Sequence, residues 1–297
     1  MRNWMVVILA GVLLVPAPAW ACSAVAVVIG GRVLLAAHND YSYDAVFKLV
    51  VTPPHDGQFG RVCTAMDTVP GWTPMSMKCM NDQGLAITHA NVPKSATPYD
   101  SDKPQFRHNF LDKIVAECVT VKQAVNLIRA YSLPPGEHGA HVHLMLADPS
   151  GEAVVVEWAN GEVKVIPRQG PTLLMTNFVL SKPETATGPK SRYARASRLL
   201  PDIREATVES LMPVVKELSV YARIKDREIG SLDTEIWDPI RRKVHMYYHC
   251  DFDHPLVLDL EAEFTKGARA VELRQLFPNP VPYTTEWRDE NGPVKGR

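Results

Sequence analysis

Residues 22–41 read CSAVAVVIGGRVLLAAHNDY, two runs rich in valine, leucine and alanine on either side of Gly30 and Gly31. Apolar runs of this kind that meet at two consecutive glycines predict a β-hairpin with a two-residue turn. Cys22 opens the first strand, and Asp40 lies near the end of the second. We therefore expect an antiparallel pair of strands that holds a cysteine at one end.

The sequence before this hairpin, residues 1–21, has the pattern of a secretory signal peptide. Arg2 gives it a short positive start, residues 5–15 (MVVILAGVLLV) are apolar, and residues 19–21 (AWA) form an A-x-A cleavage site. The apolar run is shorter than the roughly 20 residues that a comfortable bilayer span needs. We therefore expect cleavage after Ala21, a periplasmic or secreted location, and a mature chain without a membrane span.

Cleavage at this place makes Cys22 the first residue of the mature chain. Its thiol is then a nucleophile, and its free α-amine, with an ordinary pKa of about 7.7–8.0, can act as the general base. Attack on a carbonyl forms an oxyanion, which needs donors such as Asn side chains or backbone N–H groups. A carboxylate near the amine would orient it, and an arginine near the sulfur would favour the thiolate.

A cysteine at this position can also occur without any catalytic role. It can follow an A-x-A site by chance, or it can be the lipidated cysteine of a lipoprotein. Lipoprotein signals normally carry Leu or a similar residue three positions before the cysteine, where this chain has Ala19, followed by Trp20. The pattern favours a signal-peptidase site, and a non-enzymatic exported binding protein or lipoprotein stays as an alternative.

The composition excludes some classes of function. The chain has 297 residues, of which 46% are hydrophobic, so it can bury a large core. Its formal net charge is −1, and no block of Lys and Arg could follow a phosphate backbone, so we expect no nucleic-acid partner. The sequence shows no internal repeat or convincing linker, and we expect residues 22–297 to form one domain. The oligomeric state stays open, a homo-oligomer included.

The chain has five cysteines, all of them after residue 21. An odd number in an exported protein leaves at least one free thiol or an intermolecular bond. Besides Cys22, four cysteines could form up to two disulfides, with three pairings that the sequence does not distinguish. These four are Cys63, Cys79, Cys118 and Cys250.

The expected helices and strands fall into groups. Strands come first, then two helices, a second group of strands, two more helices and a late strand. This order favours an α+β fold with antiparallel sheets over a doubly wound parallel fold. The expected strands are 22–29, 32–37, 47–51, 85–90, 141–147, 153–158, 163–166, 173–178 and 243–249, and the expected helices are 106–117, 121–131 (after an N-cap at Thr120), 190–200 and 208–218.

Residues 80–87 read MNDQGLAI, and residues 90–93 read ANVP. The pair resembles the "MNEKGLA" turn and strand, and the Asn-x-Pro after it, of the choloylglycine hydrolase and penicillin V acylase family of N-terminal nucleophile hydrolases. Further stretches are similar to that family in short motifs that together touch most of the chain after residue 21. They are 38–41 (HNDY), 146–157 with 175–177, and 191–195 (SRYAR).

The resemblance implies a fold and a set of site residues. The fold is a four-layer αββα sandwich of two antiparallel sheets. The implied catalytic residues are Cys22 as nucleophile and base, Asp40 beside the α-amine, Asn91 and Asn177 as oxyanion donors, and Arg192 near the nucleophile.

Two further positions enter as secondary candidates. His38 stands where the family usually has arginine, so we expect it to replace that arginine in part, with a charge that depends on pH. Arg195 is the second candidate, after Arg192, for the arginine near the sulfur. Solvent exposure on a helix face is the ordinary alternative for both arginines.

The predicted function is hydrolysis of a linear, non-peptide acyl amide by Cys22, without a metal or organic cofactor. The substrate is a small-molecule acyl amide, and conjugated bile salts, penicillin V and N-acyl amides are all compatible with the motifs. An acyltransferase or an acyl-homoserine-lactone acylase with the same site is an alternative. His141 with His143, and a later cluster around His249, lack a compelling ligand spacing, so we interpret them as strand and loop histidines.

Overall fold

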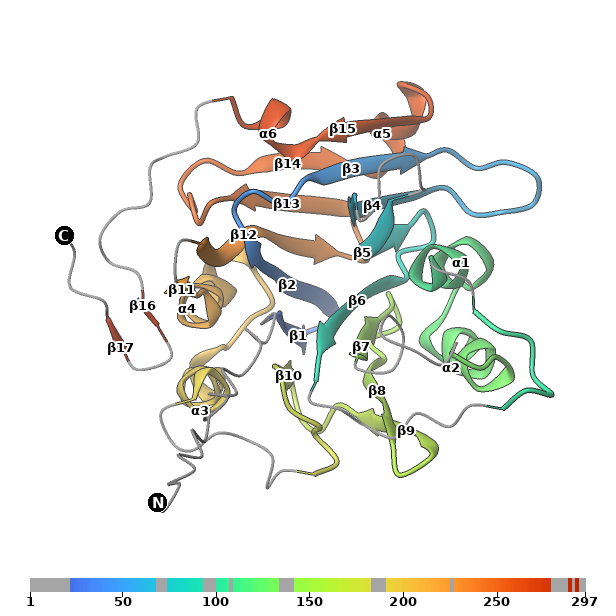
Figure 1. Cartoon of the computed structure of the whole chain (residues 1–297), viewed down its shortest axis with the longest axis horizontal. Helices are drawn as coiled ribbons and strands as arrows, with labels where there is room; N and C mark the ends of the chain where they lie inside the picture. Colours follow the sequence, from blue (N-terminus) through green and yellow to red (C-terminus); the bar gives the residue numbers. More distant parts are fainter. Residues whose placement is uncertain are drawn as a thin grey trace, which may run out of the picture.

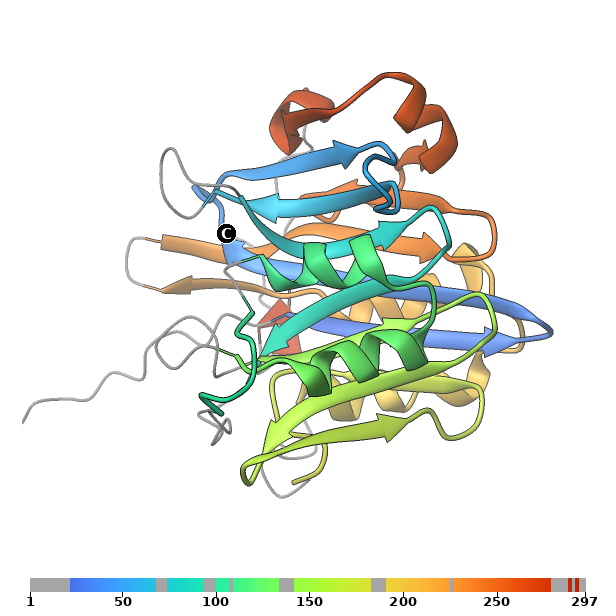
Figure 2. The same cartoon turned by 90° about the vertical axis from the view of Figure 1, so that its right-hand side faces the viewer.

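The computed structural model describes residues 22–67, 74–92, 100–106, 109–133, 142–182, 191–224, 227–278, 288–289 and 292–293. Two antiparallel sheets lie face to face, and helices cover the outer face of each (Figure 1, Figure 2). The layers therefore run helix, sheet, sheet, helix. This confirms the predicted α+β class and the four-layer αββα sandwich.

Sheet A carries the hairpin that follows Cys22. Its strands are β1 (Ser23–Ile29), β2 (Arg32–Ser42), β10 (Thr172–Met175), β11 (Tyr221–Ile224), β12 (Arg227–Asp238), β13 (Lys243–Tyr248) and β14 (Leu256–Asp259). They are arranged in the order β10-β1-β2-β12-β13-β14, and β11 pairs with β12. The cysteine end of β1 therefore lies between β10 and β2, inside the sheet.

Sheet B lies opposite. Its strands are β3 (Phe47–Thr52), β4 (Arg61–Met66), β5 (Met75–Asn81), β6 (Ala86–Asn91), β7 (Val142–Ala147), β8 (Ala153–Ala159), β9 (Glu162–Pro167) and β15 (Arg269–Glu272), in the order β15-β3-β4-β5-β6-β7-β8-β9. Two further short strands, β16 (Arg288–Asp289) and β17 (Gly292–Pro293), pair antiparallel with each other outside both sheets.

Helices form the two outer layers. Sheet B is covered by α1 (Phe110–Glu117) and α2 (Val121–Ala130), and sheet A by α3 (Arg192–Ser197), the 3₁₀ turn η2 (Leu200–Asp202) and α4 (Val208–Leu218). The short helices α5 (Leu260–Thr265) and α6 (Leu273–Leu276) flank β15. None of the helices in the described ranges combines the length and the apolar character needed to cross a membrane.

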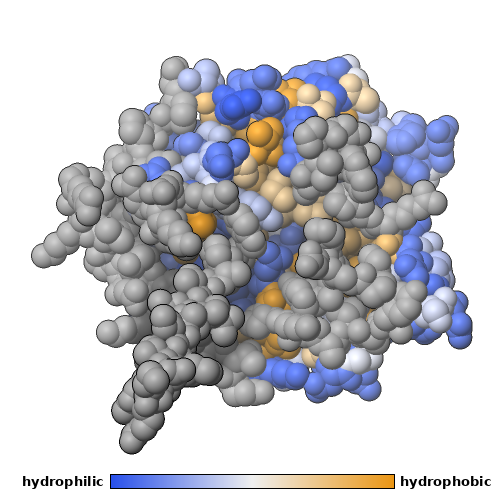
Figure 3. All heavy atoms as spheres, in the orientation of Figure 1, coloured by the Kyte–Doolittle hydropathy of each residue, from blue (hydrophilic) through white to orange (hydrophobic). Residues whose placement is uncertain are grey.

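Burial of apolar side chains holds these layers together. One cluster lies between the two sheets, a second between sheet B and its helices, and a third between sheet A and its helices. Within the described residues, Ile240 and Val257 are the large apolar side chains left exposed. Hydrophilic residues fill the upper and right-hand margins of the face in Figure 3, with apolar ones between them. The apolar surface is therefore mostly enclosed, as the hydrophobic effect requires.

Local sequence explains the hairpin and the helix next to it. Gly30 and Gly31 both have positive φ, 59° and 73°, the backbone that a two-residue type I′ turn requires. In α4, a capping box at Thr207 fixes the start, and the buried residues Leu211 and Val215 lie one turn apart. The hairpin and this helix confirm the sequence predictions.

The turn between β5 and β6 is an anchor for α1. The Asn81 side-chain amide donates to the carbonyl oxygens of Val115 and Cys118, both at 2.7 Å. Its Oδ1 accepts the backbone N–H groups of Gln83 at 3.1 Å and Leu85 at 2.9 Å. The stretch that most resembles the family therefore has a structural task here, which is to join a turn to a helix end.

Some expected boundaries were wrong. The helix expected over 106–117 begins at Phe110, because Gln105 forms a parallel β-bridge with Ser132 and holds the chain before the helix extended. The strand expected over 173–178 ends at Met175. The strands β4, β5, β11, β12, β14 and β15 and the helices α5 and α6 were not expected. Residues 141 and 190, which began an expected strand and helix, lie outside the described ranges.

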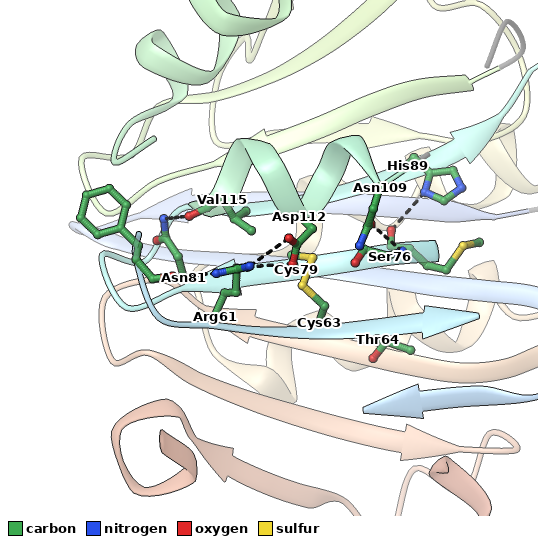
Figure 4. The surroundings of a disulfide bond; sticks show 12 residues. Arg61, Cys63, Thr64, Ser76, Cys79, Asn81, His89, Asn109, Asp112 and Val115 are labelled. Atoms are coloured by element: carbon green, nitrogen blue, oxygen red, sulfur yellow. Dashed lines mark hydrogen bonds and ion pairs between the residues drawn. A yellow bond between two sulfur atoms is a disulfide. The ribbon is translucent and has the colours of Figure 1, made fainter. Parts of the chain in front are cut away.

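One disulfide joins two neighbouring strands of sheet B, β4 and β5, beneath α1. Cys63 and Cys79 lie opposite each other on β4 and β5 and are bonded, on the side that faces α1 (Figure 4). Cys22, Cys118 and Cys250 carry free thiols. The structure thereby selects one pairing among those that the sequence left open.

Removing this disulfide should weaken the fold. The two cysteines are 16 residues apart, and a loop of that length contributes about 3 kcal/mol by chain entropy. We expect Cys63→Ser/Cys79→Ser to lower the free energy of unfolding by about that amount, measured by urea denaturation. Reduction of the wild-type protein should produce the same shift. Quantitative alkylation of both thiols in the unreduced native protein would contradict the pairing.

Candidate active site

Cys22 lies directly before β1, with 1% of its surface exposed, and faces the layer between the two sheets. The registers of β1 with β10 and with β2, continued past Ser23, bring Cys22 opposite Asn177 on one side and Asn39 on the other. The sequence-distant Asn177 therefore becomes a neighbour of the cysteine through strand pairing alone.

Asp40 and Arg192 form a buried ion pair beside this point. Arg192 Nη1 donates to Asp40 Oδ2 at 2.6 Å, and the Ser231 hydroxyl donates to Asp40 Oδ1 at 2.5 Å. Burial raises the pKa of Asp40, while Arg192 and Ser231 lower it by stabilising the carboxylate. Arg192 reaches the carboxylate from the first turn of α3, where the Ser191 hydroxyl caps the helix.

The same guanidinium connects to other predicted site residues. Arg192 Nη2 donates to Asn177 Oδ1 at 2.6 Å and lies 3.5 Å from the Cys22 carbonyl oxygen. Asn177 Nδ2 in turn donates to the Asn91 carbonyl oxygen at 2.8 Å. A continuous hydrogen-bonded chain thus runs from Asp40 through Arg192 and Asn177 to Asn91. The structure brings these four residues and Cys22 together; their catalytic roles stay predictions.

His38 and Arg195 lie nearby with different partners. His38 Nε2 donates to the Val215 carbonyl at 3.1 Å, and its Nδ1 accepts from the Thr234 hydroxyl at 2.8 Å. Burial, with Arg192 and Lys78 as further causes, lowers the pKa of His38 to about 3, so the ring is neutral near pH 7. His38 therefore provides no positive charge to the site.

Arg195 connects the two helices above sheet A. Its Nε donates to Glu217 Oε1 at 2.6 Å, and the two side chains are 15% and 12% exposed. Because Arg195 lies on α3 and Glu217 on α4, this ion pair fixes α3 on α4. The position of α3 determines where the Arg192 side chain lies. Arg195 therefore affects the site by fixing the position of this helix.

The environment of the sulfur disfavours its charged form. Burial, and then the Asp40 carboxylate, raise the pKa of the Cys22 thiol to about 12. Three groups oppose them: the backbone N–H of Asp40, the Lys78 ammonium and the Arg192 guanidinium. Burial and Asp40 thus oppose the thiolate, and the two nearby cations favour it.

Sequence reasoning missed the residues that β5 and β12 contribute. Lys78 on β5 and Asp233 and Glu235 on β12 are fully buried between the sheets, and Ser231 binds Asp40. Neither strand was expected, so no pattern drew attention to these positions. A charged residue inside a strand gives no local sign that a partner from another strand will bury it.

The histidines weighed as metal ligands have other partners where the structure describes them. His143 Nδ1 lies 3.2 Å from Glu157 Oε1, and His254 Nδ1 lies 3.0 Å from both carboxylate oxygens of Asp251. His141 lies outside the described ranges. Over those ranges, no three His, Cys, Asp or Glu side chains gather in the manner of a metal site.

Comparison with known proteins identifies the family. The chain matches the family model described as acyl-coenzyme A:6-aminopenicillanic acid acyl-transferase over residues 32–251. No curated protein sequence matches the chain significantly. A mutant of the conjugated bile acid hydrolase from Clostridium perfringens has a similar structure, with a TM-score of 0.67, 12% identity and coverage of 84% of this chain and 96% of that one. Penicillin V acylase from Agrobacterium tumefaciens gives a TM-score of 0.60, 19% identity, and coverage of 80% and 87%.

At identities of 12% and 19%, these structures establish the fold. The family match spans most of the chain, including β2 and the residues from Asp40 to Arg192. The chain therefore belongs to the acyl-coenzyme A:6-aminopenicillanic acid acyl-transferase family, which confirms the predicted kinship with choloylglycine hydrolases and penicillin V acylases and the prediction of an enzyme.

Proposed function

We propose that the chain is exported, that its signal peptide is removed after Ala21, and that Cys22 then hydrolyses a linear acyl amide. The observation that carries this proposal is the hydrogen-bonded chain from Asp40 through Arg192 to Asn177, which ends beside Cys22. The bile acid hydrolase and penicillin V acylase among the similar structures support the reaction class. The disulfide within sheet B supports an oxidising compartment such as the periplasm or the exterior.

Cleavage is the step that creates the base. In the precursor, the nitrogen of Cys22 is part of the peptide bond to Ala21 and cannot accept a proton. Once free, the α-amine takes the proton from Sγ, and the sulfur attacks the amide carbon. The resulting ammonium gives its proton to the leaving amine, and water then hydrolyses the thioester.

The polar groups around Cys22 have distinct parts in this mechanism. Asp40 orients the α-amine, and its own position is fixed by Arg192 and Ser231. Asn91 and Asn177 are the proposed donors to the oxyanion, where a donor already in place costs no reorganisation during the reaction. Arg192 holds the Asn177 amide so that its nitrogen points toward Asn91.

Acyl transfer is the second candidate function, because the matching family is described by that activity. The two functions share the acyl-enzyme and differ in what attacks the thioester, water or another nucleophile. The residues that bind the amide and form the acyl-enzyme are the same for both functions.

The test is amine release by the mature protein, with Cys22 confirmed as its first residue by intact mass. The substrates are a conjugated bile salt, penicillin V and an acyl-homoserine lactone, each with and without hydroxylamine as acceptor. Release from one class with free acid as the product supports hydrolysis, and a dominant hydroxamate supports transfer. No amine from any of the three would count against the proposed function.

A further inference from the structure

A second ionic cluster is buried between the two sheets. Lys78 of β5 pairs with Asp233 of β12, and its Nζ lies 3.6 Å from Glu235 Oε1. All three side chains are 0% exposed, and the Thr64 hydroxyl donates a hydrogen bond to the Glu235 carboxylate. Moving charges out of water is costly, and apolar residues in the same place often give equal or greater stability. A cluster of this kind next to a reactive residue therefore points to a functional role.

Strand register places this cluster beside Cys22. Asp233 pairs with Asn39 across β12 and β2, and Asn39 in turn lies opposite Cys22 when the β1–β2 register is continued. Residues directly opposite in a ladder have side chains on the same face, and neighbouring strands are about 4.8 Å apart. Asn39 Nδ2 donates to both Asp233 oxygens, at 3.1 and 3.3 Å. Lys78 thus reaches from sheet B to the face of sheet A that carries the sulfur.

Two β-bulges turn these side chains toward each other. The β4–β5 register shifts so that Met77 is an extra residue beside Lys78, and the β2–β12 register shifts so that Leu232 is extra. Bulges redirect side chains and are frequent next to active sites. Because of Leu232, Ser231 binds Asp40 on the outer face while Asp233 lies on the inner face with Lys78. Residues 231–233 of β12 therefore contribute one polar side chain to each face of sheet A, Ser231 to the outer face and Asp233 to the inner face.

The disulfide holds the sheet B part of this arrangement. Cys63 and Cys79 point toward α1, whereas Thr64 points to the opposite side of the sheet (Figure 4). Thr64 and Lys78, the sequence neighbours of the two cysteines, pair with each other in the ladder. The covalent bond on one face thus fixes the positions of the polar residues on the other.

The charges that act on Cys22 come from three elements. Asp40 of β2 opposes the thiolate, and Lys78 of β5 and Arg192 of α3 favour it. Burial alone would lower the pKa of Lys78, but Asp233 and Glu235 raise it above its ordinary value, so the ammonium keeps its proton. Both cations have carboxylate partners, but Arg192 lies with Asp40 on the outer face, whereas Lys78 lies on the inner face, toward which Cys22 also points.

We propose that Lys78 is the cation that stabilises the Cys22 thiolate, in place of the charge that neutral His38 does not supply. This inference rests on the proposed function of Cys22. When the sulfur gives its proton to the α-amine, no bond to Lys78 forms or breaks. Its positive charge then lies near the new negative charge in a layer without bulk water, where attraction between charges is strong.

The test is the rate at which iodoacetamide alkylates Cys22 as a function of pH, quantified on the N-terminal peptide by mass spectrometry. Only the thiolate reacts, so at any pH well below the pKa of the thiol the alkylation rate falls tenfold for each unit by which that pKa rises. Lys78→Met keeps the aliphatic chain and removes the charge. We expect the apparent pKa of Cys22 to rise by about one unit or more, which slows alkylation at neutral pH about tenfold. If Lys78 had a purely structural role, any substitution that disturbs the cluster should change the profile in the same way.

Two variants serve as controls. Lys48→Met removes a half-buried lysine that pairs with Asp67 at 2.6 Å on the same sheet, and should leave the profile unchanged. Glu235→Gln disturbs the cluster but leaves Lys78 with Asp233, and should not raise the pKa of Cys22. An equal rise in Glu235→Gln would assign the effect to loosened packing and overturn the proposal.

A folded Lys78→Met protein with the wild-type alkylation profile would also overturn it. If that variant does not fold, Lys78→Met/Asp233→Asn removes both charges together and gives the same readout. Amine release by the same samples separates the two proposals. Wild-type protein without turnover but with the expected effect of Lys78 on alkylation would refute the proposed function alone.

Discussion

Replacing Cys22 by alanine should abolish amine release, with kcat/KM reduced by at least ~10⁴-fold. The substitution removes the nucleophile and leaves the α-amine, Asp40 and Asn177 without a sulfur to act on. Cys22 is 1% exposed among apolar residues, so loss of one buried atom should cost only about 1 kcal/mol of stability. Activity should therefore disappear from a protein that still unfolds cooperatively near the wild-type temperature.

The matched control is Cys118→Ala. Cys118 is another buried free thiol, but it lies at the end of α1 in the layer outside sheet B. We expect this variant to keep wild-type activity and a similar small loss of stability. Wild-type turnover by Cys22→Ala would show that the chemistry occurs elsewhere in the molecule.

Replacing Arg192 by methionine should have the largest effect on stability. It leaves the Asp40 carboxylate buried without its cation and removes the donor to Asn177. Breaking a buried pair from one side costs about 3–5 kcal/mol. For a domain of this size we expect a Tm lower by on the order of 10 °C, measured by calorimetry. Turnover should fall as well, since Asp40 and Asn177 both lose their orientation.

Two further variants separate charge from geometry at this position. Arg192→Lys keeps a positive charge but lacks the planar fork that binds Asp40 and Asn177 together, so it should recover stability only in part. Arg195→Met breaks a pair whose side chains are 15% and 12% exposed, less buried than Arg192 and Asp40, and should cost less, about 2 kcal/mol. An Arg192→Met protein as stable as Arg195→Met would contradict the importance of the buried pair.

The parts of the fold that could be predicted from sequence are those with local causes. Two adjacent glycines determine the β1–β2 turn, and the helical spacing of apolar residues with a capping threonine determines α2 and α4. By contrast, β5 and β12 carry Lys78, Asp233 and Glu235 in their interiors. These charges are buried only because partners about 155 positions away in the chain come to meet them. No window of neighbouring residues contains that information.

The candidate site, too, could be predicted from the sequence only in part. Family motifs pointed to Asp40, Asn177 and Arg192, and the structure places them in one hydrogen-bonded chain. The motifs did not indicate which partner each residue has. His38 illustrates this, because its position in the motif suggested a titrating cation, whereas its neighbours in space keep it buried and neutral.

The proposed catalysis depends most on Cys22 acting as an N-terminal residue, and one comparison tests this directly. Two proteins are prepared from a cleavable fusion, one beginning at Cys22 and one beginning at Ala21, and their amine release is measured on the same substrate. Both have the thiol, Asp40 and Arg192, but only the first has its α-amine on Cys22. We predict that the longer protein is slower by at least ~10³-fold, because the general base is missing. Equal rates would contradict the mechanism.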